Sequence, residues 1–159
     1  MSLDPALLDL PTLIALSGTL TNEHLLGRIR EVGHPALRIS HGYVFQHLIA
    51  GPRAVTELAE LLGVTQQAAS KVVLELEGLG YVERKPDPLD SRVRRVALTA
   101  LGHGAIERAR AARRSLERVL EQRVGARALA ATRRTLLALL EITGGLSDVA
   151  QRRVRPPSS

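Results

Sequence analysis

Apolar side chains recur at intervals of three and four residues along most of the chain, which is the spacing of α-helices. This pattern predicts two long helical regions, residues 4–33 and 34–51, each ending at a glycine. Two shorter helices, residues 56–62 and 65–80, are predicted on either side of Gly63, and each begins with a threonine that can cap it. Gly63 permits a tight turn between them because glycine tolerates positive φ.

A single region of the chain has the pattern of β-strands. Residues 81–85 and 93–98 form two short runs, and turn-forming residues fill the segment 86–92 between them. This predicts a β-hairpin with a basic tip. A helix-turn-helix followed by a hairpin is the order of elements in a winged helix.

Two more helices are predicted after the hairpin, from Thr99 to Gly125 and over residues 126–143. The first carries a seam of mostly small residues at spacings of four and three, namely Ala105, Ala109, Ala112, Leu116, Val119 and Arg123. The second has leucines that are expected to face inward, namely Leu129, Leu136, Leu139 and Leu140. These helices carry more apolar surface than a small domain needs, so we expect them to pack against a second copy of the chain.

The expected fold class is therefore mainly α, with a winged helix-turn-helix domain and terminal helices that form a dimerisation domain. We place the winged domain at residues 35–99 and the dimerisation helices at residues 1–34 and 100–146. Residues 147–159 are expected to be a flexible basic tail.

Composition excludes several classes of protein. The 159 residues are 45% hydrophobic and 24% charged, which is typical of a globular chain, and no cysteine is present for disulfides or thiolate metal sites. Charges or prolines interrupt every apolar run, so we expect no membrane span. Residues 1–13 contain two acidic residues and no basic one, unlike the start of a signal peptide, which favours a cytoplasmic location.

Charge points to an anionic partner. The formal net charge is +6, which favours nucleic acid, and aromatic residues are only 2%, too few for stacking on single strands. Double-stranded DNA is therefore the expected partner. Residues 53–95 contain seven basic and seven acidic residues, and the surplus lies in residues 108–127 and in the tail. A DNA surface on the winged domain thus requires its charges to be segregated.

The helix over residues 65–80 has one face suited to a major groove. On a helical wheel, its apolar residues gather on one side, and Gln67, Ser70, Lys71 and Leu74 gather on the other, with Gln66 on the flank. Glutamine can bond adenine, serine a base edge or a phosphate, and lysine guanine or a phosphate. Thr65 would offer its hydroxyl and the helix N-terminus to a phosphate. The competing interpretation is an ordinary solvated face.

The hairpin tip has candidate contacts to a minor groove. Arg92 and Arg94 lie on one side of it and Arg95 on the other, and arginine is favoured in a narrow minor groove by its negative potential. Asp90 lies two residues before Arg92 and is expected to orient its guanidinium through an ion pair. A solvated basic hairpin is the alternative.

The sequence resembles the MarR family of bacterial transcription regulators at residues 61–65 (LLGVT) and 87–99 (DPLDSRVRRVALT). The Asp-x-Arg at Asp90 and Arg92, with Leu-Thr closing the hairpin, is the most specific part. The element order agrees over residues 35–145.

This resemblance implies a homodimer held by the terminal helices, a recognition helix at residues 65–79 in the major groove, and Arg92 in the minor groove. It also implies a small anionic or phenolic effector between the dimerisation helices and the winged domain. Many members have an acidic-basic pair where this chain has Leu74 and Glu75, and the basic residue ties the recognition helix to the wing. Leu74 is expected to pack under the wing, with contact to a thymine methyl as the alternative, and the anchoring of the wing stays open.

Candidate ligand residues follow from their place in the first two helical regions: Arg28, His41 and Phe45 are expected in the wall of an effector pocket. His103 and Glu107 lie one helical turn apart, near the expected position of His41, but this pattern is too sparse for a zinc site. We expect neither a bound metal nor a cofactor.

No motif indicates an enzyme, because the chain has no nucleophile elbow, no phosphate-cradling glycine loop and no His-Glu-x-x-His. The expected function is a sequence-specific regulator of transcription, a ligand-responsive repressor that binds a pseudo-palindromic operator in double-stranded DNA as a homodimer. A winged-helix scaffold for protein interactions, without specific DNA binding, is the alternative.

Overall fold

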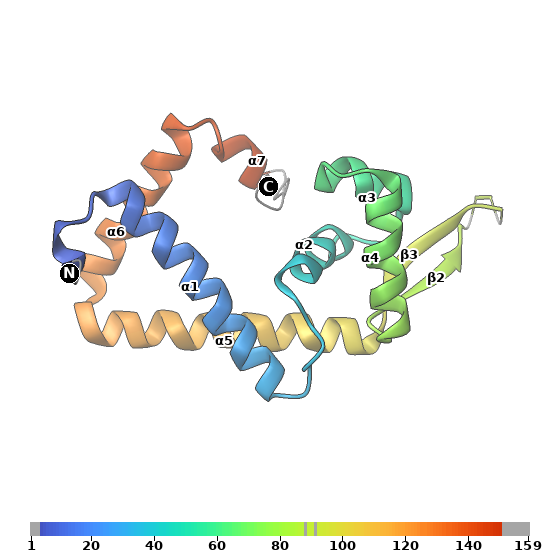
Figure 1. Ribbon diagram of the computed structural model, residues 1–159, viewed down its shortest axis with the longest axis horizontal. Helices are drawn as coiled ribbons and strands as arrows, with labels where there is room; N and C mark the ends of the chain where they lie inside the picture. Colours follow the sequence, from blue (N-terminus) through green and yellow to red (C-terminus); the bar gives the residue numbers. More distant parts are fainter. Residues whose placement is uncertain (1–3, 88, 91, 151–159) are drawn as a thin grey trace.

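The computed structural model describes residues 4–87, 89–90 and 92–150, most of them helical (Figure 1). In chain order the elements are the 3-10 helix η1 (Pro5–Leu7), α1 (Leu10–Glu31), α2 (Ile39–Leu48), β1 (Arg53–Ala54), α3 (Val55–Leu62), α4 (Gln66–Gly78), β2 (Val82–Pro86), β3 (Arg94–Leu98), α5 (Ala100–Val124), α6 (Ala126–Ile142) and α7 (Leu146–Ala150). The three strands form an antiparallel sheet of order β1-β3-β2. The expected fold class, mainly α with a winged helix-turn-helix, is confirmed.

The helix-turn-helix forms as predicted around Gly63 and Thr65. Gly63 ends α3 with a φ of 67°, and the hydroxyl of Thr65 accepts a hydrogen bond of 3.1 Å from a backbone N–H in the first turn of α4. Thr56, however, does not cap α3, which begins one residue before it. Instead the carboxylate of Glu57 accepts a hydrogen bond of 2.7 Å from the backbone N–H of Ala54.

Three other elements differ from the expected ones. α2 begins at Ile39, later than predicted, because the preceding loop holds the buried ring of His34 against the hydroxyl of Tyr81, with 3.0 Å between Nδ1 and the oxygen. β1 has two residues, too few to show an alternating pattern. α7 replaces the start of the predicted flexible tail, and the rest of that tail, residues 151–159, lies outside the described residues.

The hydrophobic core lies in the winged domain, where α2, α3, α4, the hairpin and the start of α5 meet. Its largest fully buried side chains are those of Leu58, Leu76, His41, Val44, Val73, Val82 and Val96. The long helices contribute little to a core within one chain: α1 buries only Leu25, and α6 buries no described residue.

The leucines predicted to face inward on α6 are thus not fully buried within the single chain, and their burial against a second copy stays a prediction. Leu129, Leu139 and Leu140 are half-buried and Leu136 is exposed, since no other described element covers this helix completely. Along the predicted seam of α5, Ala105 is buried, but Val119 is exposed.

Figure 1 shows how the long helices carry the winged domain. α5 extends from the hairpin to the far end of the molecule, α1 crosses and contacts it, and α6 rises from its far end. Among the described residues, no helix is both long and apolar enough to cross a membrane.

One glycine allows the hairpin and α5 to meet closely. A Cβ on Gly102, in the first turn of α5, would collide with the carbonyl oxygen of Tyr81 and lie 3.0 Å from the side chain of Leu98. The backbone N–H of Thr99 donates to that same carbonyl at 3.1 Å. Because Gly102 has no side chain, the first turn of α5 can pack directly against Tyr81 at the entry to the hairpin.

We expect Gly102→Ala to lower the free energy of unfolding by about 1–3 kcal/mol, because the added methyl group overpacks this contact. Gly104→Ala is the matched control: its Cβ would meet no atom within 4 Å, and alanine favours a helix over glycine by up to about 1 kcal/mol. Urea denaturation at one protein concentration measures both variants. Equal effects of the two substitutions would contradict the close contact.

Candidate nucleic-acid interface

The outer face of α4 is polar and solvent-exposed. Thr65, Gln66, Gln67 and Lys71 are exposed and Ser70 is half-buried. On the opposite face Ala69, Val73 and Leu76 are buried in the core. The wheel therefore divided the helix correctly, and its polar face is free to meet a partner.

Leu74 does not pack under the wing, which corrects the prediction from its sequence position. Its side chain is 56% exposed on the same outer face as Lys71. The wing meets α4 elsewhere, through Arg84 of β2, whose Nε lies 3.3 Å from a carboxylate oxygen of Glu77. Of the two interpretations of Leu74, contact with a thymine methyl is the one compatible with this exposure.

The hairpin tip presents Arg92 to solvent. Its side chain is 90% exposed, and its Nε lies 3.1 Å from Oδ1 of Asp90. The backbone N–H of Arg92 also donates to Oδ1, at 3.0 Å, and these bonds lower the pKa of Asp90. The guanidinium of Arg92 is thus held by Asp90 while it remains accessible. Arg94, on β3, is exposed as well.

Arg95, on the other side of β3, anchors the wing to the helix-turn-helix. Its guanidinium donates to the buried carboxylate of Asp87 and lies 3.2 Å from Oε2 of Glu57 in α3. Asp87 also accepts a hydrogen bond of 2.8 Å from the backbone N–H of Leu89, and its pKa is lowered mainly by Arg95. This network was missed in the sequence, although the alternation of the strand placed Arg95 opposite Arg94.

Glu75 does not approach the wing but ties α4 to α2. It forms an ion pair with Arg38, and its Oε1 lies 3.5 Å from Nε2 of His41. His41 is fully buried, and burial lowers its pKa while the charge of Glu75 opposes that shift. Sequence reasoning missed this contact because residues 38 and 75 are far apart along the chain.

Ion pairs segregate the charges of the winged domain. The paired acidic residues of segment 53–95 are Glu57 and Asp87 (both with Arg95), Glu75 (Arg38), Glu77 (Arg84), Glu83 (Lys85) and Asp90 (Arg92). Within the described part of the same segment, Lys71 and Arg94 form no ion pair and are exposed. The segment 53–95, which has no net charge, therefore exposes cations at α4 and at the hairpin.

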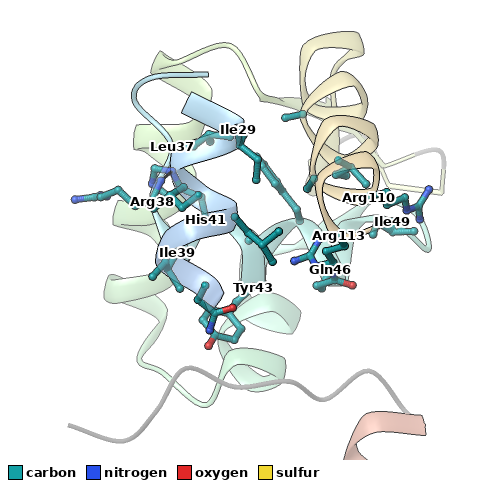
Figure 2. Close-up of a pocket in the computed structure, with 18 residues that line it drawn as sticks. Ile29, Leu37, Arg38, Ile39, His41, Tyr43, Gln46, Ile49, Arg110 and Arg113 are labelled. Carbon is teal, nitrogen blue, oxygen red and sulfur yellow. Dashed lines mark hydrogen bonds between the residues drawn. The ribbon is translucent and has the colours of Figure 1, made fainter. Parts of the chain in front are cut away.

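A cavity of about 480 Å³ lies between α1, α2 and α5 (Figure 2). Its walls include Leu25 and Ile29 of α1, and Arg110 and Arg113 of α5. His41 and Phe45 line it, as predicted. The prediction for Arg28 is wrong, because that side chain pairs on the surface with Glu31, at 2.8 Å.

Sequence reasoning also missed the two arginines of α5 in the cavity, although their three-residue spacing puts them on one side of a helix. Among the described residues, no three metal-ligating side chains gather at one point. Glu107, considered with His103, pairs instead with Arg110 at 2.6 Å.

The comparisons with known proteins agree with this geometry. Residues 37–93 match the model of the MarR family, and no curated protein matches the chain. The expected resemblance to this family is thus confirmed, and the match contains the helix-turn-helix and β2 but ends just before β3.

Three solved structures show the same fold. A structure of RV1404 from Mycobacterium tuberculosis has a TM-score of 0.73 and 23% identity, covering 89% of this chain and 97% of that one. Apo wild-type MarR from E. coli has a TM-score of 0.64 and 24% identity, covering 84% and 98%. A single-residue mutant of MepR from S. aureus, bound to an oligodeoxyribonucleotide, has a TM-score of 0.63 and 16% identity, covering 86% and 99%.

The fold and the exposed polar helix define a winged helix-turn-helix protein. Residues 37–93 match the MarR family model, and the fold shared with solved MarR-type regulators extends through most of the remaining helices.

We expect Asp87→Asn to lower the urea midpoint at pH 7, because the neutral amide loses the charge-assisted bond with Arg95. The pKa of Asp87 is lower in the folded chain, so its contribution is present at neutral pH and is lost as the pH falls through that lowered value. The difference between the variant and the wild type should therefore shrink below about pH 4. Glu60→Gln, at an exposed residue without an ion pair in the described chain, should show no such convergence.

Proposed function

We propose that this protein is a transcription regulator that binds specific sequences in double-stranded DNA. The observation that carries the proposal is the pairing of an exposed polar helix face with an exposed arginine at the hairpin tip, held by Asp90. A major groove accepts a helix and an adjacent minor groove accepts an arginine. The winged domain, residues 35–99, is the DNA-binding part.

In this proposal each predicted residue has one role. Gln66, Gln67, Ser70 and Lys71 contact bases or phosphates in the major groove, and the capped N-terminus at Thr65 faces a phosphate. Arg92 enters the minor groove, with Arg94 as an additional contact, and Asp90 orients the guanidinium of Arg92.

The functional unit is proposed to be a homodimer. Exposed apolar residues lie on α1 and α6, including Leu20 at 63% and Ile142 at 83%, which is costly for a chain alone in water. The helices in residues 1–34 and 100–146 would cover these surfaces in a second copy. Two-fold symmetry then requires a pseudo-palindromic site with half-sites about 10 bp apart.

The cavity supports a ligand-responsive repressor. Its volume suits a small organic molecule, and Arg110 and Arg113 give it an anionic preference beside the apolar surface of α1 and α2. A small anionic or phenolic effector that binds there is proposed to weaken the binding of the protein to DNA.

Selection of duplexes from a randomised library by the purified protein tests DNA recognition, with fluorescence anisotropy over a salt series as the readout. A recovered pseudo-palindrome that binds more tightly than its scrambled version supports the proposal. Equal, salt-dependent binding to both duplexes would indicate only a basic surface. An intact dimer that binds neither would favour a protein-interaction scaffold, for which exposed Leu74 would be the contact.

On the selected duplex we expect Arg92→Ala to weaken binding by about 1–3 kcal/mol while the dimer stays intact. Lys85→Ala is the matched control, because Lys85 is exposed on the hairpin but pairs with Glu83, at 2.9 Å. Anisotropy measures the affinity and analytical ultracentrifugation the dimer. Equal losses for the two variants would contradict a specific role for Arg92.

The effector proposal is tested with benzoate and its neutral analogue benzamide. Benzoate is expected to release the selected duplex at lower concentration than benzamide, and Arg113→Gln to remove that difference. Arg118→Gln, on the exposed part of α5, serves as the control for charge. Release by both compounds alike would argue against recognition of an anion.

A further inference from the structure

We infer that Glu75 is a positioning residue that ties α4 to the wall of the cavity, so that filling the cavity changes the orientation of the helix. This inference rests on the proposed function, because it concerns how α4 meets DNA. It departs from the arrangement implied by the family resemblance, in which a basic residue at this point ties the helix to the wing. Here the residue is acidic, and its partners lie on α2.

The contact involves three side chains with different degrees of burial. Arg38, just before the first turn of α2, forms the ion pair with Glu75, whose side chain is only 34% exposed. The backbone N–H of Arg38 donates to Nδ1 of the fully buried His41, at 3.3 Å. Neutral His41 therefore carries its proton on Nε2, which faces Glu75.

The imidazole of His41 has an unsatisfied donor in this arrangement. Among the described residues its buried Nε2 has no hydrogen-bond partner, and Oε1 of Glu75 is 3.5 Å away. Leaving a buried donor unpaired is unfavourable, so a small displacement of α2 that shortens this distance would be favourable. The contact is thus sensitive to the position of α2.

The same stretch of α2 forms a wall of the cavity. Arg38, His41 and Gly42 all line it, and in Figure 2 the side chain of Arg38 points away from Arg110 and Arg113. A molecule in the cavity therefore touches one side of α2, while Glu75 is bound on the other. Displacement of α2 is transmitted to α4 through Arg38 and His41.

Because of the position of Glu75 on α4, this displacement would also move the outer, polar face of the helix. Glu75 lies one turn after Lys71, so the two residues are neighbours along the helix. Two residues after Glu75, Glu77 joins α4 to the wing through its ion pair with Arg84. Rotation at Glu75 would move Lys71 and Gln67 relative to a groove.

The first test asks whether each substitution strengthens or weakens binding to the selected duplex. Removing a carboxylate beside DNA strengthens binding if charge alone matters, so Glu60→Gln should bind equally or more tightly. Glu75→Gln is expected to bind at least about threefold more weakly, because α4 loses its tie. Arg38→Gln should weaken binding too, and the double variant should be no weaker than Arg38→Gln alone.

The second test fills the cavity without a ligand. Gly42 lines it, and a Cβ there would meet no atom within 4 Å, so Gly42→Leu places an apolar group in the space. It is expected to weaken DNA binding in the wild-type background but not further in the Glu75→Gln background. Gly104→Leu, on α5, controls for replacing a helical glycine.

Tighter binding by Glu75→Gln, additive losses in the double variant, or no effect of Gly42→Leu would each overturn the inference. Failure of the wild type to select any duplex would instead refute the proposed function. Circular dichroism and sedimentation confirm that each variant is folded and has the same oligomeric state.

Discussion

The orientation of the winged domain depends on the close contact between Tyr81 and the start of α5. The Tyr81 carbonyl accepts the backbone N–H of Thr99, and Gly102 leaves room for this approach. The Tyr81 hydroxyl meets His34, and its ring lies 5.9 Å from that of Phe45. One residue thus joins the loop before α2, the entry to the hairpin and the helix that carries both. Any shift here would move the wing relative to the long helices.

In the winged domain, the positions of the charged side chains matter more than the net charge. In the described part of residues 53–95, every acidic residue except Glu60 has a cationic partner, and several of these pairs join separate elements. The pairs therefore serve two purposes: they hold the wing and α4 in place, and they leave Lys71 and Arg94 exposed and outside any ion pair of the described residues. An exposed ion pair contributes little energy, but a network between elements specifies orientation. This explains why net charge alone is a poor guide to the proposed DNA-binding surface.

The long helices follow a different rule. α1 and α6 bury few residues within the chain, and α1 and α5 line the cavity together with α2. α2 stands between the two parts, with one side against the cavity and the other against Glu75. The proposed regulation uses this position, because a helix shared by a ligand site and a DNA-binding face couples the two without a long pathway.

The sequence by itself determined the features that depend on neighbouring residues. The turn at Gly63, the cap at Thr65, the hairpin and the pair of Asp90 and Arg92 all arise within a few positions, where spacing and residue type suffice. Tertiary structure decided what depends on distant partners: the late start of α2, the exposure of Leu74, the network of Arg95, and the cavity lining that excludes Arg28. Glu75 is the clearest case, since its partners lie more than thirty residues away and only folding brings them together. The reason is physical: periodicity tells which face of an element is buried, but not which element covers it.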